Sequence, residues 1–228
     1  MDEVNELDSD LDGTEKCSLC GNHTKTLKPQ PPDRERGPYL HCHRCDLIFL
    51  PNDQILPPYE EKQRYMEHDN THENEGYVQM FEDFISETVL PFCQEGKALD
   101  FGCGPGPVLA DLLKKRGFSV DIYDPFFFPN DRYRNETYDL VTTTEVFEHL
   151  RNPEQVLEEL CCITKSGSIL AVMTHLHQGP DEFSEWWYHW DPTHITFYSS
   201  KTMMWITDNW PLDIIFSDNF KHTALVRK

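Results

Sequence analysis

Apolar and polar residues alternate in blocks along the second half of the chain. Four short apolar runs, at 98–101, 118–123, 138–143 and 168–174, have the composition of buried strands. Stretches with helical spacing, at 108–116 and 154–165, lie between these runs. Because strands and helices alternate, the pattern predicts an α/β domain built on a mostly parallel sheet.

The segments on either side of this core have patterns of their own. Residues 74–92 place Tyr77, Phe81 and Phe84 on one helical face and end near Pro91, which predicts an amphipathic helix covering the sheet. Residues 199–210 also read as a helix, beginning at a serine. The runs 212–216 and 223–227 flank a turn-forming stretch, so they predict a terminal antiparallel hairpin.

The N-terminal part divides into a tail and a module. Residues 1–16 contain seven acidic side chains against Lys16 and few large apolar groups, which predicts a disordered acidic tail. Residues 17–58, called the N-terminal module below, hold two close cysteine pairs and end in a proline-rich linker. Residues 59–228 are then the main domain.

Two Cys-x2-Cys hooks mark the N-terminal module as a metal site. Cys17 and Cys20 are separated from Cys42 and Cys45 by 21 residues, close to the spacing of tetrathiolate zinc sites. So small a segment has little core of its own, and a metal would supply folding energy. We expect structural Zn²⁺ in a zinc-ribbon-like module; iron or a redox dithiol are the alternatives.

The strongest chemical signal is a glycine-rich loop after the first strand. Gly102, Gly104 and Gly106 follow Asp100, and glycines there let backbone N–H groups approach a ligand at a helix N-terminus. Asp124 ends the next strand and could accept hydrogen bonds from a ribose. The loop therefore fits an adenosyl cofactor or a dinucleotide, but the dinucleotide fingerprint needs glycine at the position of Pro107.

The order Asp100-x-Gly-x-Gly-x-Gly resembles motif I of class I methyltransferases, in which the loop holds S-adenosylmethionine. Residues 138–150 and 190–199 resemble further segments of the type 11 and type 23 branches. The resemblance implies a Rossmann-like fold of the seven-stranded type with a C-terminal hairpin, and S-adenosylmethionine as cofactor. It also implies the following cofactor-binding residues: Asp100, Gly102, Cys103, Gly104, Gly106, Asp124, Thr144 and Glu145.

One segment departs from that family pattern. Only fourteen residues separate Asp124 from Asp139, where the family usually fits a helix, a third strand and a contact to adenine. Phe126, Phe127 and Phe128 lie in this shortened segment and could pack on an adenine ring or cover the sheet edge. The adenine contacts are therefore left unassigned.

Charge restricts the partners. The formal net charge is −20, and such a field repels phosphate backbones, so a nucleic-acid partner is not expected. No apolar run approaches the ~20 residues that span a bilayer, and the N-terminus lacks the basic start of a signal peptide. We expect a cytoplasmic protein without membrane contact.

Histidine is the residue type expected to accept a proton if the methyl acceptor must lose one. His194 is the first candidate, because Trp186, Trp187, Tyr188 and Trp190 precede it and could wall an acceptor pocket. His149 is the second catalytic candidate. His175, Glu145 and Glu148 are further candidates, and for each of these residues a structural role is the alternative.

The sequence thus predicts a methyltransferase that acts on a small-molecule or carrier-bound acceptor. An RNA methyltransferase with a zinc recognition module is one alternative, although the acidity opposes it. A non-catalytic interaction protein with a vestigial methyltransferase fold is another, and the intact glycines and Asp124 oppose that reading.

Overall fold

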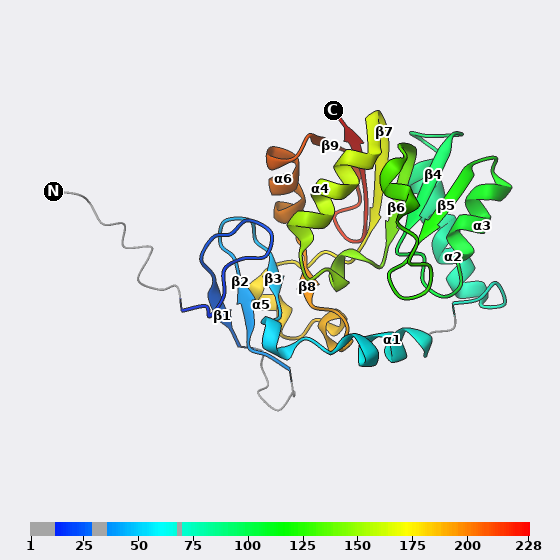
Figure 1. The fold of residues 1–228 in the computed structure, drawn as a ribbon. Coiled ribbons are helices and arrows are strands. Elements are labelled where there is room, and N and C mark those ends of the chain that lie inside the picture. The colour runs from blue at the N-terminus through cyan, green and yellow to red at the C-terminus, as the bar shows by residue number, and fades with distance from the viewer. Residues whose placement is uncertain (1–11, 29–35, 68–69) are drawn as a thin grey trace.

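The structure is a computed structural model that describes residues 12–28, 36–67 and 70–228. A six-stranded sheet forms the larger part, with a four-stranded sheet beside it (Figure 1). The strands of the larger sheet follow the spatial order β5-β4-β6-β7-β10-β9. They are β4 (Lys97–Phe101), β5 (Ser119–Tyr123), β6 (Tyr138–Thr144), β7 (Thr164–Met173), β9 (Leu212–Ser217) and β10 (His222–Arg227).

The larger sheet is parallel at one side and antiparallel at the other. Strand β4 pairs in parallel with β5 and β6, β6 pairs in parallel with β7, and β10 runs antiparallel to both β7 and β9. The predicted parallel sheet and terminal hairpin are confirmed. The expectation of seven strands is corrected to six within the described residues. The segment between β5 and β6 holds only a short 3-10 helix, η4 (Asp131–Asn135), because it is too short for another helix and strand.

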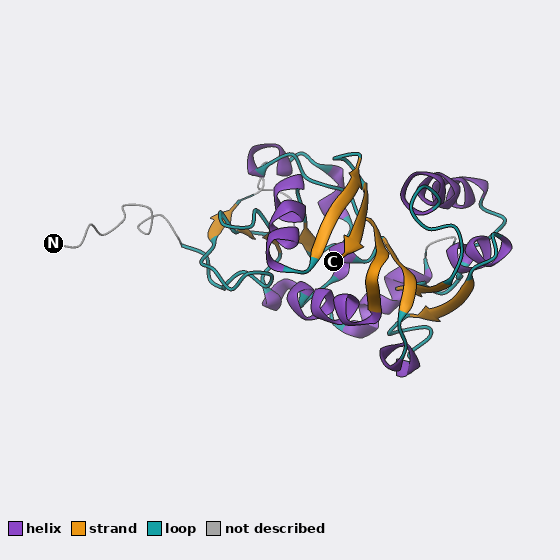
Figure 2. Cartoon of the chain, turned by 90° about the horizontal axis from the view of Figure 1, so that it is seen from above, coloured by secondary structure: helices purple, strands orange, loops and turns teal. Residues whose placement is uncertain are grey.

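Helices cover both faces of the larger sheet (Figure 2). Helices α2 (Glu75–Phe84), η3 (Ile85–Val89) and α3 (Val108–Lys115) share one apolar cluster with Ala98 and Leu140. Helices α4 (Pro153–Ile163) and α6 (Ser200–Asn209) contribute to a second cluster, with Leu99 and Val141. Neighbouring residues of one strand thus face opposite layers, as the period of two requires.

Local signals in the sequence explain where these helices begin. The Asn74 side chain accepts a hydrogen bond from the Tyr77 N–H and caps α2. Ser199 and Thr202 form a reciprocal capping box at the start of α6. Pro153 occupies the first turn of α4, where its missing N–H costs nothing.

The small sheet has the order β1-β2-β3-β8 and combines strands from the N-terminal module and from the main domain. Its strands are β1 (Lys25–Leu27), β2 (Tyr39–His41), β3 (Ile48–Phe49) and β8 (Thr196–Phe197). Strand β8 lies about 150 residues after β3 and pairs with it antiparallel. The N-terminal module therefore shares its sheet with a segment from the main domain, and their apolar interiors are continuous.

Short helices connect the two sheets. Helix α1 (Pro58–Met66) runs between them along one side of the molecule (Figure 1). The remaining short helices are η2 (Asn52–Gln54), η5 (Phe147–His149), α5 (Pro180–Phe183) and η6 (Trp187–Trp190). No helix in the described ranges is long and apolar enough to cross a membrane.

The predicted disordered tail falls mostly outside the described residues. Residues 1–11 lie there, so for them disorder stays a prediction. From residue 12 onward the chain contacts the small sheet: the Thr26 N–H donates to Asp12, and the Asn52 N–H donates to Glu15. Contacts of the N-terminal module thus begin before the boundary expected at residue 16.

Substitution of Phe197 tests how much the shared small sheet contributes to the free energy of unfolding. Its fully buried ring contacts Phe183 and Tyr39, with centroids 5.0 and 5.9 Å away. We expect Phe197→Ala to lower the free energy of unfolding by about 3–5 kcal/mol, because it leaves a cavity. Phe220→Ala, at a ring that is 58% exposed, should cost about 1 kcal/mol or less. Urea unfolding of both variants provides the measurement, and equal effects would contradict the shared core.

Candidate functional site

A cavity of about 630 Å³ opens where β4, β5 and β6 end. This volume is in the range of small-molecule sites, and the carboxyl ends of parallel strands are where ligands bind in open α/β sheets. Residues from the glycine loop, from α1 and from the segment before β8 line its walls. They include Tyr65, Asp100, Gly102, Cys103, Gly104, Phe126, Phe127, Thr144, Glu145, His149 and His194.

The loop between β4 and α3 can be built only with glycine at two of the predicted positions. Gly102 has φ +80°, and a Cβ there would lie 2.3 Å from a methyl carbon of Val146. At Gly106 a Cβ would lie 2.0 Å from the carbonyl oxygen of Asn70. The glycines thus let the chain pass close to two neighbouring segments at the floor of the cavity.

Asp100 lies at the cavity with its carboxyl group almost completely buried. The residue is 1% exposed, and the hydroxyl of Thr142 on β6 donates to Asp100 Oδ1 at 3.2 Å. Burial raises the pKa of Asp100 to about 7, and the hydrogen bond from Thr142 opposes that rise only in part. A cationic ligand beside Asp100 would favour the ionised carboxylate.

Asp124 joins the two loops that bound the cavity. Its Oδ2 accepts the Gly104 N–H at 3.0 Å, and its Oδ1 accepts the N–H groups of Phe126 and Phe127 at 2.8 and 3.0 Å. The side chain therefore fixes the glycine loop against the segment after β5. Its predicted contact with a ribose stays a prediction, and a carboxylate with about four acceptor positions has one left for it.

The end of β6 brings two carboxyl groups together. Glu145 has φ +53°, an uncommon conformation for a residue with a side chain, and its buried Oε1 has no hydrogen-bond partner among the described residues. Glu148, fully buried behind it, accepts hydrogen bonds from the hydroxyls of Thr174 and Tyr188. Burial, and for Glu145 also its neighbour Glu148, raises the pKa of both groups.

His149 and His194 complete this end of the cavity. Their ring centroids lie 4.9 Å apart. His149 Nδ1 is 2.9 Å from the carbonyl oxygen of Thr193, and His194 Nδ1 is 2.7 Å from that of Tyr188. Burial lowers the pKa of both rings, that of His194 to about 3, so both are neutral at pH 7. The structure thus places both predicted catalytic histidines on one wall with Glu145.

Comparison with known proteins agrees with this geometry. A family model described as a methyltransferase domain matches residues 66–214. The chain belongs to the class I S-adenosylmethionine-dependent methyltransferases. No curated protein is significantly similar to it.

Solved structures share the fold of this methyltransferase at low identity. An O-methyltransferase family protein from Burkholderia thailandensis matches with TM-score 0.52 and 13% identity, over 74% of this chain and 63% of that one. An S-adenosylmethionine-dependent methyltransferase from Thermotoga maritima matches with TM-score 0.47 and 16% identity, over 74% and 100%. At 13% identity the likeness to the Burkholderia protein shows the fold and leaves the acceptor open.

The aromatic run before His194 does not wall the cavity of the methyltransferase, contrary to the expectation from the sequence. Trp187 and Trp190 are 55% and 52% exposed. Trp186 and Tyr188 instead pack in the apolar cluster of the small sheet, around Phe197. Their apolar area is buried by the N-terminal module, which could not be seen from the sequence.

Phe126 and Phe127 do line the cavity, beside Tyr123 and Tyr133, whereas Phe128 pairs its backbone with Asp124. The shortened segment after β5 thus presents aromatic rings to the ligand space. The hypothesis that these rings pack on adenine stays a prediction.

Two arginines that the sequence did not single out hold the loop carrying His194. Arg36, in the N-terminal module, donates to the carbonyl oxygens of His189, Asp191 and His194. Arg64 on α1 donates through Nε and Nη2 to the Asp191 carboxylate. In the sequence, both arginines lie in short segments of otherwise polar residues. That pattern is shared by ordinary surface arginines, so it could not identify them.

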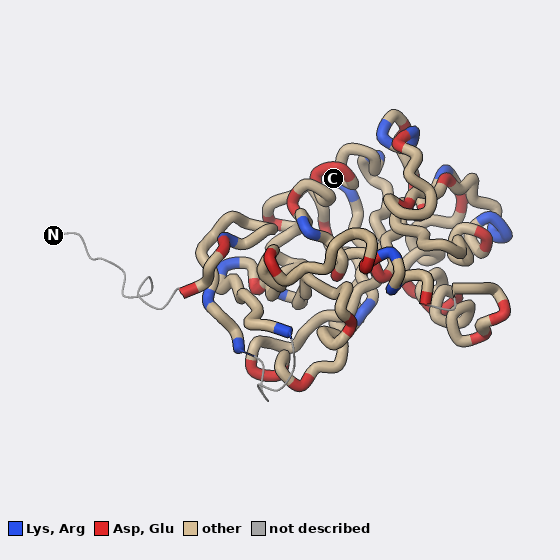
Figure 3. The backbone as a smooth tube through the Cα atoms, turned by 60° about the horizontal axis from the view of Figure 1, so that its bottom comes forward, with Lys and Arg blue, Asp and Glu red and all other residues tan. Residues whose placement is uncertain are grey.

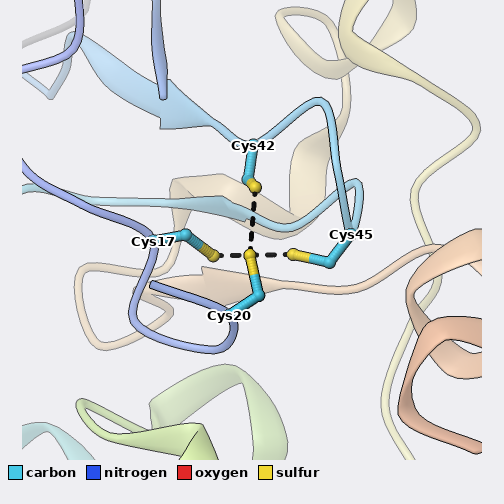
Figure 4. A group of neighbouring side chains, drawn as sticks. All are labelled: Cys17, Cys20, Cys42 and Cys45. Atoms are coloured by element: carbon cyan, nitrogen blue, oxygen red, sulfur yellow. Dashed lines mark hydrogen bonds between the residues drawn. The ribbon is translucent and has the colours of Figure 1, made fainter. Parts of the chain in front are cut away.

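The four cysteines of the two hooks converge as predicted (Figure 4). The sulfur atoms of Cys17 and Cys45 are 3.5 Å apart, and those of Cys20 and Cys42 are 3.4 Å apart. These distances exceed a disulfide bond by more than 1 Å, and thiolates around one zinc ion are roughly 3.8 Å apart. Each hook closes with the same turn, in which Gly21 N–H donates to Cys17 O and Asp46 N–H donates to Cys42 O.

Asp100 gives this site a pH dependence that can be measured without ligand. Because its pKa is about 7 in the folded protein and ordinarily 3.8, the folded state binds more protons between these values. Linkage then requires the free energy of unfolding to fall as pH rises through this window. Asp100→Asn lacks this titration but can still accept from Thr142. We expect the free energy of unfolding of Asp100→Asn, relative to that of the unsubstituted protein, to rise by about 2–4 kcal/mol between pH 4 and pH 8.

Chemical unfolding at several pH values measures this difference. Asp213→Asn is the matched control, because that carboxyl lies on β9 at the surface with 60% of its side chain exposed. A stability difference between Asp100→Asn and the unsubstituted protein that stays constant with pH would contradict the assignment.

Proposed function

We propose that this protein transfers a methyl group from S-adenosylmethionine to a small-molecule or carrier-bound acceptor inside the cavity. The observation that carries the proposal is that two chemically distinct groups of residues line one cavity. The glycine loop with Asp100 forms one group, and Glu145 with the two histidines forms the other. S-adenosylmethionine supplies an electrophilic methyl group on a sulfonium.

The charges around the cavity support a neutral or cationic ligand. Among the described residues two arginines line it, and both are already paired: Arg134 Nε with Glu159 at 2.7 Å and Arg151 with Glu61 at 3.1 Å. Five acidic residues also line it: Glu61, Asp100, Glu145, Glu159 and Asp191. Acidic positions are spread over the whole chain as well (Figure 3). Both features oppose phosphate-rich acceptors such as RNA.

The residues present suit the cofactor. Asp100 offers a buried carboxylate to the cationic amino-acid end, Asp124 has an acceptor position left for a ribose, and Phe126 and Phe127 offer ring surfaces to a base. Catalysis is then chiefly a matter of positioning, with water excluded by α1 and the loop before β8. A proton released by the acceptor can be taken at the Nε2 of His194 or His149.

The cysteine cluster holds Zn²⁺ in this proposal. Four sulfurs close a tetrahedron and leave no open position, so the ion has a structural role. Cys17, Cys42 and Cys45 are buried in the same apolar cluster as the larger sheet. The ion therefore stabilises the base on which the His194 loop is built.

Calorimetric titration of S-adenosylmethionine into the purified protein tests the function. We expect saturable binding at one site, weakened tenfold or more in Asp124→Ala, which loses charge-assisted hydrogen bonds to the glycine loop. Asp213→Ala, at an exposed carboxyl on β9, should bind like the unsubstituted protein. A folded, zinc-loaded protein that binds no cofactor would favour the non-catalytic alternative.

Metal analysis tests the cysteine cluster. After exchange into citrate, which removes loosely bound ions, we expect one zinc per chain. Cys42→Ser should lose the zinc and unfold at lower denaturant, because metal binding contributes folding energy. Cys162→Ser replaces an exposed cysteine far from the cluster and should keep both zinc and stability. Full zinc content in Cys42→Ser would remove the assignment.

A further inference from the structure

Three potential metal ligands meet at the cavity wall that contains His149 and His194. One ligand atom each from Glu148, His149 and His194 lies within 4.8 Å of the other two. Ligands about 2.0–2.2 Å from a shared ion are roughly 3–4.4 Å apart. Small rotations of these side chains would therefore bring all three onto one ion.

The two imidazoles are held in the tautomer that binds a metal. Each Nδ1 faces a backbone carbonyl oxygen, that of Thr193 for His149 and that of Tyr188 for His194. A carbonyl only accepts, so each Nδ1 carries the hydrogen and each Nε2 has a lone pair. For neither Nε2 does the described part of the chain provide a hydrogen-bond partner. Metal-binding histidines are typically oriented by this kind of bond to the second nitrogen.

The carboxylates are oriented in the same way. Both oxygens of Glu148 accept hydroxyl hydrogen bonds, from Thr174 at 2.9 Å and from Tyr188. The Tyr188 hydroxyl also lies 3.3 Å from Glu145 Oε2, so it links the two carboxyl groups. Glu145 Oε1 is buried without a partner in this cluster. A buried carboxylate oxygen with no donor is costly, and a cation would supply the missing interaction.

The backbone holds these groups in place. Ile195 N–H donates to the Glu148 carbonyl oxygen at 2.7 Å, which joins the end of β6 to the His194 loop. Arg36 fixes the other side of that loop through three carbonyl oxygens. Glu148 and His194 are 46 residues apart, so their approach depends on this scaffold and not on local sequence.

We propose that Glu148, His149 and His194, with Glu145 beside them, bind a divalent first-row transition metal ion at this wall of the cavity. Two imidazole nitrogens and a carboxylate suit ions such as Mn²⁺, Fe²⁺, Co²⁺ or Zn²⁺, whereas Mg²⁺ and Ca²⁺ prefer all-oxygen sites. The ion would face the space assigned to the methyl acceptor. An ion bound there would occupy the Nε2 atoms of both histidines, and it would replace the proton-accepting role proposed above for them. The inference rests on side-chain geometry and does not require a particular acceptor.

Titration of Co²⁺ into protein whose cysteines already hold zinc tests the site. Calorimetry gives the stoichiometry, and the absorption spectrum identifies the ligands, because thiolates give intense charge-transfer bands and nitrogen or oxygen ligands give only weak visible bands. We expect one Co²⁺ per chain, without thiolate bands. His149→Ala and His194→Ala should each weaken binding by tenfold or more.

Two control variants test whether Co²⁺ binds to other groups of the protein. His72→Ala removes an exposed histidine, and Glu87→Gln alters a separate group of possible ligands that Glu87 forms with Asp218 and His222, so neither should change Co²⁺ binding. Glu145→Gln is the second test variant, because it exchanges one atom and preserves the volume if an alanine variant fails to fold. It should also weaken binding.

Three results would overturn the site: Co²⁺ binding that survives both histidine substitutions, binding seen only through thiolate bands, or no binding by the folded protein at millimolar Co²⁺. S-adenosylmethionine binding is measured on the same sample. Cofactor binding without Co²⁺ would reject the metal site alone, and Co²⁺ without cofactor would reject the methyltransferase function alone.

Discussion

The hydrogen bonds of Asp46 join the cysteine turns to the C-terminal half of the chain. Asp46 has φ +66°, nearly the value of Gly21 in the equivalent turn of the other hook, although it carries a side chain. His41 Nε2 and the Ser199 hydroxyl contact its carboxylate at 2.9 and 2.7 Å, and His177 Nε2 contacts its carbonyl oxygen at 3.0 Å. These bonds offset the strain of that conformation. They also hold the start of α6 and the segment after β7 against the turn of the second cysteine hook.

The position of the cavity wall that contains His149 and His194 follows from this junction. With the segment after β7 and the start of α6 fixed at Asp46, the intervening chain must pass beside the N-terminal module. There β8 pairs with β3, and Arg36 binds the loop that carries His194. The N-terminal module is thus part of the structure that shapes the cavity. The cysteine cluster therefore lies in the part of the structure that positions the His194 loop.

Local pattern in the sequence was enough to predict most of the larger sheet and the cysteine cluster. The strands at 98–101 and 138–143 and the helix at 108–116 were confirmed within one or two residues, since burial dictates their periodicity. Strand β8 could not be predicted, because two residues carry no period and its partner is distant in sequence. The same reason explains the error about the aromatic run. Its apolar surface is satisfied by Tyr39 and Phe197, and periodicity does not reveal which partner covers an apolar segment.

The buried carboxyl groups indicate which ligands the cavity is built for. Asp100 and Glu148 are buried and Glu145 is partly buried, and all three have raised pKa values, so holding them ionised costs electrostatic free energy in the ligand-free fold. Asp191, which also lines the cavity, shows the opposite. Burial would raise the pKa of Asp191, but hydrogen bonds from Thr193 and Arg64 outweigh it. Because no cationic side chain among the described residues pairs with Asp100, Glu145 or Glu148, a positively charged ligand would relieve the cost. A sulfonium cofactor at Asp100 and a metal ion at Glu148 would each do so.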